Sequence, residues 1–314
     1  MKSKRGFEFS FAWIFAIFVG AIIVFIAIYA ASRFIATGTY QIETVTAKEL
    51  SIIFEPLETG LAAGKSSIVN LREDTRIYNK CYDTGSFGRH RISLSTRGIG
   101  TTWKKPGGDI LIPNKYLFSD DVEEGRTIYF FSKPFEMPFK VSEIIFLTTK
   151  SYCFLNAPEE IEDEVTGLIL QNIKLDNCSD LDVRVCFGGG EGCDIQVTGI
   201  CFGDCESSYD YGFVEKDGES LFYEGSLIYA AIFSSKEIYE CNVKRLMKRL
   251  VQQALLFEDE AFFLAGKCGS LPSAGLIQLV SIARALENSK DLVLVRDIAK
   301  EVEEQNDAAQ CSLW

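Results

Sequence analysis

The fold class depends first on the stretch FSFAWIFAIFVGAIIVFIAIYAAS, residues 9–32, which carries no charge between Glu8 and Arg33. As an α-helix these 24 residues span about 36 Å, enough to cross a hydrocarbon layer of about 30 Å with some tilt. Only a helix satisfies its own backbone hydrogen bonds in lipid. Aromatic residues near both ends are typical of interfacial anchors. We therefore predict one transmembrane helix, with a buried core helix as the alternative.

The charges that flank this helix predict its orientation. Three basic residues lie within the first five positions, whereas only Arg33 and Lys48 follow within the next twenty residues. Because an excess of Lys and Arg marks the cytoplasmic side, we expect the N-terminus inside and the body outside. The alternative is a secretory signal cleaved near residues 29–31, but such signals have apolar regions of only about 7–15 residues.

The segment Lys4-Arg5-Gly6-Phe7, directly before the apolar helix, resembles the class III, prepilin-type signal of archaea. Arg5, Gly6 and Phe7 match that pattern, whereas Glu8 departs from it because this position is usually apolar or small. The resemblance implies that a peptidase cuts after Gly6 and that the apolar helix then packs into a filament core. The resemblance to the prepilin-type signal covers about thirty residues. The rest of the chain resembles archaeal single-span membrane proteins. An ordinary basic flank of a membrane helix is the alternative.

Composition sets further limits. A length of 314 residues suggests about two domains, and 47% hydrophobic with 24% charged residues is typical of a globular chain. The net charge of −12 argues against nucleic-acid binding, which needs a basic surface. His90 is the single histidine, so most histidine-dependent chemistry is excluded, and we expect no cofactor.

All ten cysteines follow the apolar helix, and an even number on the predicted outer side indicates up to five disulfides. They are Cys81, Cys153, Cys178, Cys186, Cys193, Cys201, Cys205, Cys241, Cys268 and Cys311. A zinc site is the alternative, but the five cysteines between residues 178 and 205 include no C-x2-C pair.

Two disulfide pairs are predicted from local sequence. Cys186 and Cys193 flank a glycine-rich turn between two expected strands, and Cys268 and Cys311 bracket the C-terminal helices. We expect each bond to stabilise the fold by about 2–4 kcal/mol.

The hydrophobic periodicity predicts an α+β protein: a transmembrane helix, then a β-rich, disulfide-stabilised domain and a helical C-terminal third. The expected parts are a cytoplasmic stub with the anchor (1–36), a juxtamembrane helix and linker (37–66), the β-rich domain (67–233) and the helical region (234–314). We expect Pro56 to interrupt the juxtamembrane helix. Residues 227–233 fit a strand or a helix equally well.

Local signals add finer predictions. Pro158, followed by three acidic residues within four positions, predicts a helix start, and that helix is expected to end near Gln171. His90 stands between two arginines and is expected at a surface position on a strand edge. Cys–His catalysis at His90 is disfavoured because disulfides would use the thiols.

Charge is uneven along the chain. Residues 156–225 hold 17 acidic and 3 basic side chains, whereas Lys244, Arg245, Lys248 and Arg249 form a basic strip on the first C-terminal helix. The simplest interpretation is two solvated faces. The alternative is that the strip docks against the acidic region, within one chain or between neighbours.

Three further motifs lie in the acidic region. Asp176, Asp180 and Asp182 could bind calcium, although they lack the glycine and distal glutamate of an EF-hand, so capping and solvation are favoured. The glycines of residues 188–192 lack the Lys-Ser/Thr of a phosphate loop. Asn177 begins an N-x-S tripeptide that matches the glycosylation pattern.

From these features we expect a membrane-anchored extracytoplasmic protein for binding or assembly, with a pilin-like surface subunit as its specific form. The expected partners are the lipid bilayer and, through the outer domain, other proteins or further copies. The alternative function is a membrane-tethered hydrolase that uses two carboxylates, because acidic residues are plentiful.

Overall fold

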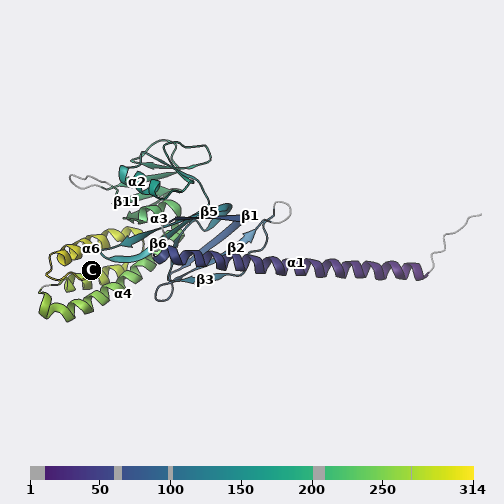
Figure 1. The fold of residues 1–314 in the computed structure, drawn as a ribbon, viewed down its shortest axis with the longest axis horizontal. Coiled ribbons are helices and arrows are strands. Elements are labelled where there is room, and N and C mark those ends of the chain that lie inside the picture. The colour runs from purple at the N-terminus through teal and green to yellow at the C-terminus, as the bar shows by residue number, and fades with distance from the viewer. Residues whose placement is uncertain (1–10, 60–65, 98–101, 201–208, 270) are drawn as a thin grey trace, which may run out of the picture.

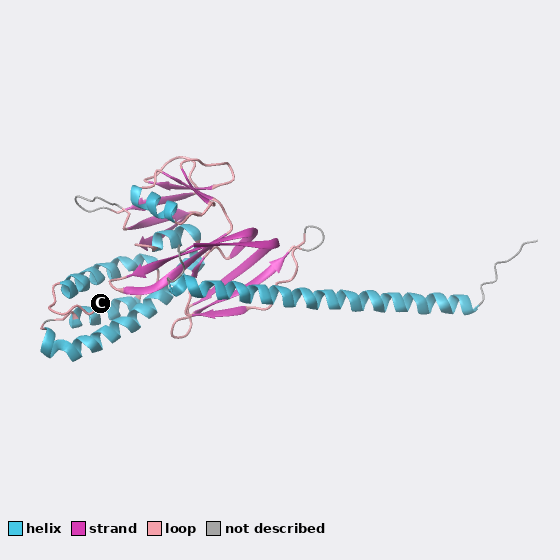
Figure 2. Cartoon of the chain, in the orientation of Figure 1, coloured by secondary structure: helices cyan, strands magenta, loops and turns pink. Residues whose placement is uncertain are grey.

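The computed structural model describes residues 11–59, 66–97, 102–200, 209–269 and 271–314. Cys201, Cys205 and the expected processing segment Arg5-Gly6-Phe7 lie outside these ranges. The described chain has a long N-terminal helix, two sheets and a C-terminal helical part (Figures 1 and 2), so the α+β prediction is confirmed.

Helix α1 (Phe11–Thr59) is one helix of 49 residues. Its first part, Phe11–Arg33, is long and apolar enough to cross a membrane, and none of it is buried against the rest of the protein. This part projects alone in Figure 1, whereas the C-terminal part of α1 lies along the first sheet. The interpretation as a buried core helix is therefore wrong for this segment.

The predicted interruption of α1 at Pro56 is also wrong, because the backbone stays helical to Thr59. Proline has no amide hydrogen, so the carbonyl of Ile52, four residues earlier, loses its helical partner. Only three residues follow Pro56 before the helix ends, which confines the disturbance to the last turn.

The first sheet has the strand order β3-β2-β1-β5-β6-β4. Its strands are β1 (Ser66–Tyr82), β2 (Arg89–Thr96), β3 (Ile110–Pro113), β4 (Tyr116–Phe118), β5 (Val122–Glu136) and β6 (Lys140–Thr148). All neighbouring pairs are antiparallel except β4 and β6. The Leu117 amide of edge strand β4 donates to His90 of β2, so the sheet curls until these strands meet around an apolar interior.

The second sheet has the order β12-β11-β10-β9-β7-β8. Its strands are β7 (Tyr152–Leu155), β8 (Ile173–Leu175), β9 (Val183–Phe187), β10 (Ile195–Gly199), β11 (Tyr211–Lys216) and β12 (Glu219–Glu224). Helix α2 (Glu159–Gly167) connects β7 to β8. The expected end of α2 near Gln171 is wrong by four residues, because Ile169 adopts a left-handed φ of 55° that a helix does not continue through.

Helix α3 (Leu227–Phe233) lies between the two sheets, and all seven of its residues are buried. The Phe233 ring lies 5.4 Å from the ring of Phe131 in the first sheet and 4.6 Å from that of Tyr152 in the second. A segment that is apolar on every side suits such a position, and a helix closes its own backbone hydrogen bonds there. This packing resolves the strand-or-helix ambiguity in favour of the helix.

The C-terminal third is helical, as predicted. It consists of α4 (Lys236–Cys268), α5 (Ser273–Ala285), a short 3-10 turn (Ser289–Asp291) and α6 (Leu292–Asp307). The periodic apolar residues of α4 that the sequence indicated, from Tyr239 to Ala254, are buried. Figure 1 places these helices at the end of the body opposite to the projecting half of α1.

Candidate functional site

His90 is fully buried, so its expected place on a surface strand edge is wrong. Its Nδ1 lies 2.8 Å from Asn79 Oδ1 of β1, and its Nε2 lies 2.9 Å from Asn242 Oδ1 of α4. The Leu117 amide of β4 also donates to Nε2, at 3.2 Å. The flanking arginines suggested exposure, but the side-chain alternation of β2 turns His90 toward α4. Its polar partners come from distant parts of the sequence.

Arg245 is fully buried beside this histidine, so it is not part of an exposed basic strip. Its Nε donates to the Phe87 carbonyl at 2.9 Å, and its Nη1 donates to Asn242 Oδ1 at 2.8 Å. A Cβ at Gly88, whose φ is 63°, would lie 2.7 Å from Arg245 Nε, so this position needs glycine. We call the cluster of Asn79, His90, Asn242 and Arg245 the polar junction.

The electrostatics of the polar junction disfavour proton-transfer chemistry. Burial lowers the pKa of His90 well below its ordinary value, and the positive charge of Arg245 lowers it further. Burial also lowers the pKa of Arg245, to about 10. Cys81 lies opposite His90 in the β1–β2 register, but its sulfur is bonded to Cys241. The arrangement therefore ties α4 to the first sheet.

Sequence reasoning missed Asn79 and Asn242 as members of this junction. The available signal was on α4, where Asn242 and Arg245 stand among the buried apolar residues Tyr239, Val243 and Leu246. A polar residue within an apolar stripe indicates a buried hydrogen-bond partner. The sequence does not say which strand supplies that partner.

Among the other residues of the basic strip, Lys248 contacts the loop that follows β1. Lys248 donates to the carbonyl of Asp83 in the β1–β2 loop, rather than to the acidic region. Lys244 and Lys248 line a groove of about 690 Å³ between this loop, α4 and α5. The groove carries charges of both signs, since Asp83, Arg284 and Glu287 also line it.

Four disulfides join the cysteines of the described residues: Cys81–Cys241, Cys153–Cys178, Cys186–Cys193 and Cys268–Cys311. Both pairs predicted from local sequence are confirmed, and the disulfide interpretation is correct for these eight cysteines. Within the described ranges no group of three His, Cys, Asp or Glu side chains is placed to hold a metal ion.

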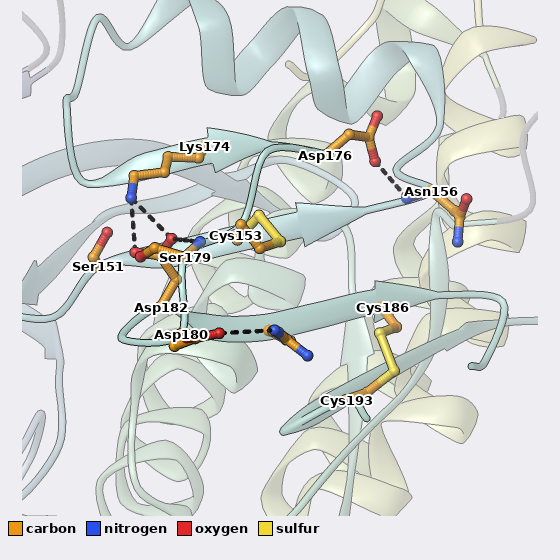
Figure 3. The surroundings of a disulfide bond; sticks show 12 residues. Ser151, Cys153, Asn156, Lys174, Asp176, Ser179, Asp180, Asp182, Cys186 and Cys193 are labelled. Atoms are coloured by element: carbon orange, nitrogen blue, oxygen red, sulfur yellow. Dashed lines mark hydrogen bonds and ion pairs between the residues drawn. A yellow bond between two sulfur atoms is a disulfide. The ribbon is translucent and has the colours of Figure 1, made fainter. Parts of the chain in front are cut away.

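The strands that flank the Cys186–Cys193 loop are parallel. The chain must therefore turn back within seven residues to start β10 beside β9. Gly188, Gly189 and Gly192 have φ values of 77°, 90° and 77°, which suit glycine alone without strain. Figure 3 shows the disulfide across the mouth of this loop.

The three aspartates considered for calcium bind other groups (Figure 3). Lys174 Nζ donates hydrogen bonds to both carboxylate oxygens of Asp182, at 2.9 and 2.8 Å, and the Ser179 backbone amide donates a further one. These bonds, led by that from Lys174, hold the pKa of Asp182 well below its ordinary value. Asp176 accepts from the Asn156 amide at 3.3 Å, and Asp180 faces Arg184 at 3.9 Å. Asn177, between them, is exposed.

A pocket of about 280 Å³ between β5, α2 and α3 contains carboxylates. Tyr229 donates to Glu164 Oε2 at 2.5 Å, and Lys133 forms an ion pair with the same carboxylate. Burial, followed by the bond to Glu164, raises the pKa of Tyr229 far above its ordinary value, so its proton stays on the phenol. Glu164 of α2 is therefore bonded to Lys133 of β5 and Tyr229 of α3, so these three side chains join the three elements. The hydrolase alternative stays a prediction.

No protein-family model, curated protein or solved structure matches this chain.

Proposed function

We propose that this chain is a single-pass membrane protein whose body lies outside the cytoplasm and serves binding or assembly, as a pilin-like surface subunit. The observation that carries the proposal is the division of α1. Phe11–Arg33 is apolar and exposed, whereas the rest of the same helix lies along the first sheet. An apolar rod of this length in water would expose far more hydrocarbon than soluble proteins tolerate, so lipid or other rods must cover it.

The disulfides support an oxidising location for the body. Four bonds lie in the described part of the chain, and structural disulfides persist outside the cytoplasm. The excess of basic residues before α1 favours the same orientation through a separate physical effect.

The continuous helix supports assembly as the specific role. Because α1 has no break between its apolar half and the half on the sheet, every copy holds its rod in the same direction relative to its body. A constant direction is what repeated head-to-tail contacts need in order to form a regular filament. The resemblance of residues 4–7 to a prepilin-type signal agrees with this role.

Orientation is tested by labelling lysines with an amine reagent that does not cross membranes. In intact cells that make an unprocessed Gly6→Leu variant, which keeps Lys2 and Lys4, we expect label on the exposed Lys105, Lys267 and Lys290, and none on Lys2 or Lys4 until the cells are lysed. The N-terminal lysines thus serve as an internal control for the lysines of the body. Label on the body only after lysis would contradict the extracytoplasmic location.

The pilin-like role is tested by mass spectrometry of the N-terminus of the membrane form. We expect the mature chain to begin at Phe7, a Gly6→Leu variant to keep Met1, and a Ser3→Ala control to be processed normally. The mass of the peptide that contains Asn177 reports whether this residue carries a glycan. An unprocessed wild-type N-terminus would contradict the pilin-like role while leaving the anchor intact.

A further inference from the structure

We infer that the end of the first sheet nearest the transmembrane segment binds the headgroups of anionic lipids. This inference rests on the proposed membrane anchor and adds a lipid preference to it. The surface, which we call the basic rim, is formed where β1 bulges, β2 ends and β5 passes Gly125. Its basic members are Arg72, Arg76, Arg97, Lys104, Lys105 and Arg126.

The position of the basic rim follows from α1. The Gly108 amide donates to Thr44 Oγ1 at 2.8 Å, so this point of the sheet lies about 16 Å along the helix beyond Arg33. Figure 2 shows β2 with its arrowhead toward the projecting half of α1. The other end of β2 faces α4, because the neighbouring Phe87 carbonyl accepts from Arg245.

The rim reaches closer to the bilayer than Gly108 does. The Gly107 amide bonds to the Leu94 carbonyl, and the Lys104 amide bonds to the Thr96 carbonyl two residues further along β2. Two strand residues advance about 7 Å, which places Lys104 about 10 Å beyond Arg33. The polar headgroup region adds about 5–8 Å on each side of the hydrocarbon, so the Lys104 backbone lies a few Å outside this layer, within reach of the long basic side chains of the rim.

The charge of the rim differs from that of the whole chain. The rim contains six basic residues and only three acidic ones, Glu73, Asp74 and Glu124, whereas the whole chain has a net charge of −12. Asp74 is shared by Arg97 and Arg126, at 3.5 and 2.7 Å. Positive charge therefore remains at the surface next to the bilayer, where anionic headgroups attract it.

Two rim residues are available for lipid phosphates without breaking an ion pair. Arg72 and Lys105 are exposed and have no ion-pair partner among the described residues. Beside them, the half-buried Trp103 is held by Arg76, whose guanidinium lies 4.2 Å from the ring centre. Tryptophan at the headgroup level is a common membrane contact, so charge and ring favour the same partner.

The acidic region carries the opposite charge to the basic rim. Residues 156–225 form α2 and most of the second sheet, with 17 acidic and 3 basic side chains. Figure 1 shows α2 and β11 to the side of α1 and farther from its projecting half than β2 is. Repulsion from anionic headgroups and attraction of the rim would therefore orient the body in the same sense.

The test uses the full chain, one copy per lipid nanodisc, in phosphatidylcholine alone or with about 40% phosphatidylglycerol. Hydrogen exchange is followed in the rim peptides around residues 71–76, 102–106 and 124–127. We expect several-fold slower exchange in the anionic discs at low salt, and we expect most of this difference to disappear at 0.5 M NaCl because salt screens exposed charges.

A double variant, Arg72→Glu with Lys105→Glu, should lose the difference between the two lipids. The matched control, Lys267→Glu with Lys290→Glu, changes the same net charge at exposed positions of the helical end and should keep it. Equal exchange of the wild-type rim in both lipids would overturn the inference. So would protection that appears only with two copies per disc, because the rim would then bind a second copy.

Failure of the anchor itself gives a different result. If the chain does not enter nanodiscs at all, the proposed membrane function fails together with this inference. If it enters both kinds of disc equally well and the rim exchanges at the same rate in each, only the lipid preference is wrong.

Discussion

The two sheets share helix α3 but differ in how they are held together. Strands β1 and β5 of the first sheet have 17 and 15 residues, whereas no strand of the second sheet exceeds six. The first sheet has its own apolar interior, and the polar junction and one disulfide, Cys81–Cys241, join it to α4. The second has two disulfides between residues 153 and 193. Short strands bury less apolar surface, so covalent bonds take a larger share of the stabilisation there.

The largest effect is expected where the two sheets meet. Phe233→Ala removes a ring that packs against both of them, and we expect a loss of about 3–5 kcal/mol in the free energy of unfolding. Urea unfolding followed by near-UV circular dichroism measures it. The control Phe263→Ala, at a position 79% exposed, should change stability by less than about 0.5 kcal/mol. If Phe233→Ala left the first sheet unchanged, the sheets would not form one cooperative unit.

Removal of the disulfides of the second sheet should cause an intermediate loss in the free energy of unfolding, and the loosening should be confined to that sheet. Replacing both Cys153 and Cys178 by serine opens a loop of 25 residues and should cost about 3 kcal/mol. The same change at Cys186 and Cys193 opens a loop of seven residues and should cost about 2 kcal/mol. Hydrogen exchange should show the loosening in the second sheet. Equal loosening of β1 and β5 would contradict the proposed division of roles.

The stability of the protein should also depend on pH, and the dependence has opposite signs in the two sheets. In the first sheet burial raises the pKa of Glu123 to about 7, against an ordinary value of 4.5, although Thr149 donates two hydrogen bonds to it. Its stabilisation is therefore fully present below about pH 4.5 and is lost as the pH rises through 7. This change amounts to at most about 3 kcal/mol.

A Glu123→Gln variant should flatten the stability profile between pH 4.5 and 8, measured by urea unfolding at each pH. Glu191→Gln, at an exposed position, is the control. In the second sheet the lowered pKa of Asp182 gives the reverse sign, because its stabilisation is present above its ordinary pKa of 3.8 and is lost as the pH falls. An Asp182→Asn variant should therefore be less stable at neutral pH and equal to the wild type in acid.

Local patterns in the sequence were sufficient for several features. The apolar run of residues 9–32, the helix start at Pro158 and the apolar period of α4 each depend on residues within a few turns of one another. The same holds for Cys186–Cys193, whose partners are seven residues apart. Cys268–Cys311 was predictable because the helices between its partners were recognisable.

Other features were decided only by tertiary structure. His90 and Arg245 look like surface residues from their neighbours in sequence, yet both are buried where α4 packs on the first sheet, and Asn242, 152 residues from His90, lies within hydrogen-bond distance of each. Residues 227–233 became a helix because both sheets cover them. The basic rim gathers residues from three separate segments, and the contact of Gly108 with Thr44 fixes its position along α1. Hydrophobic period and chain spacing act over short separations, whereas burial and surface charge depend on which distant segments the fold brings together.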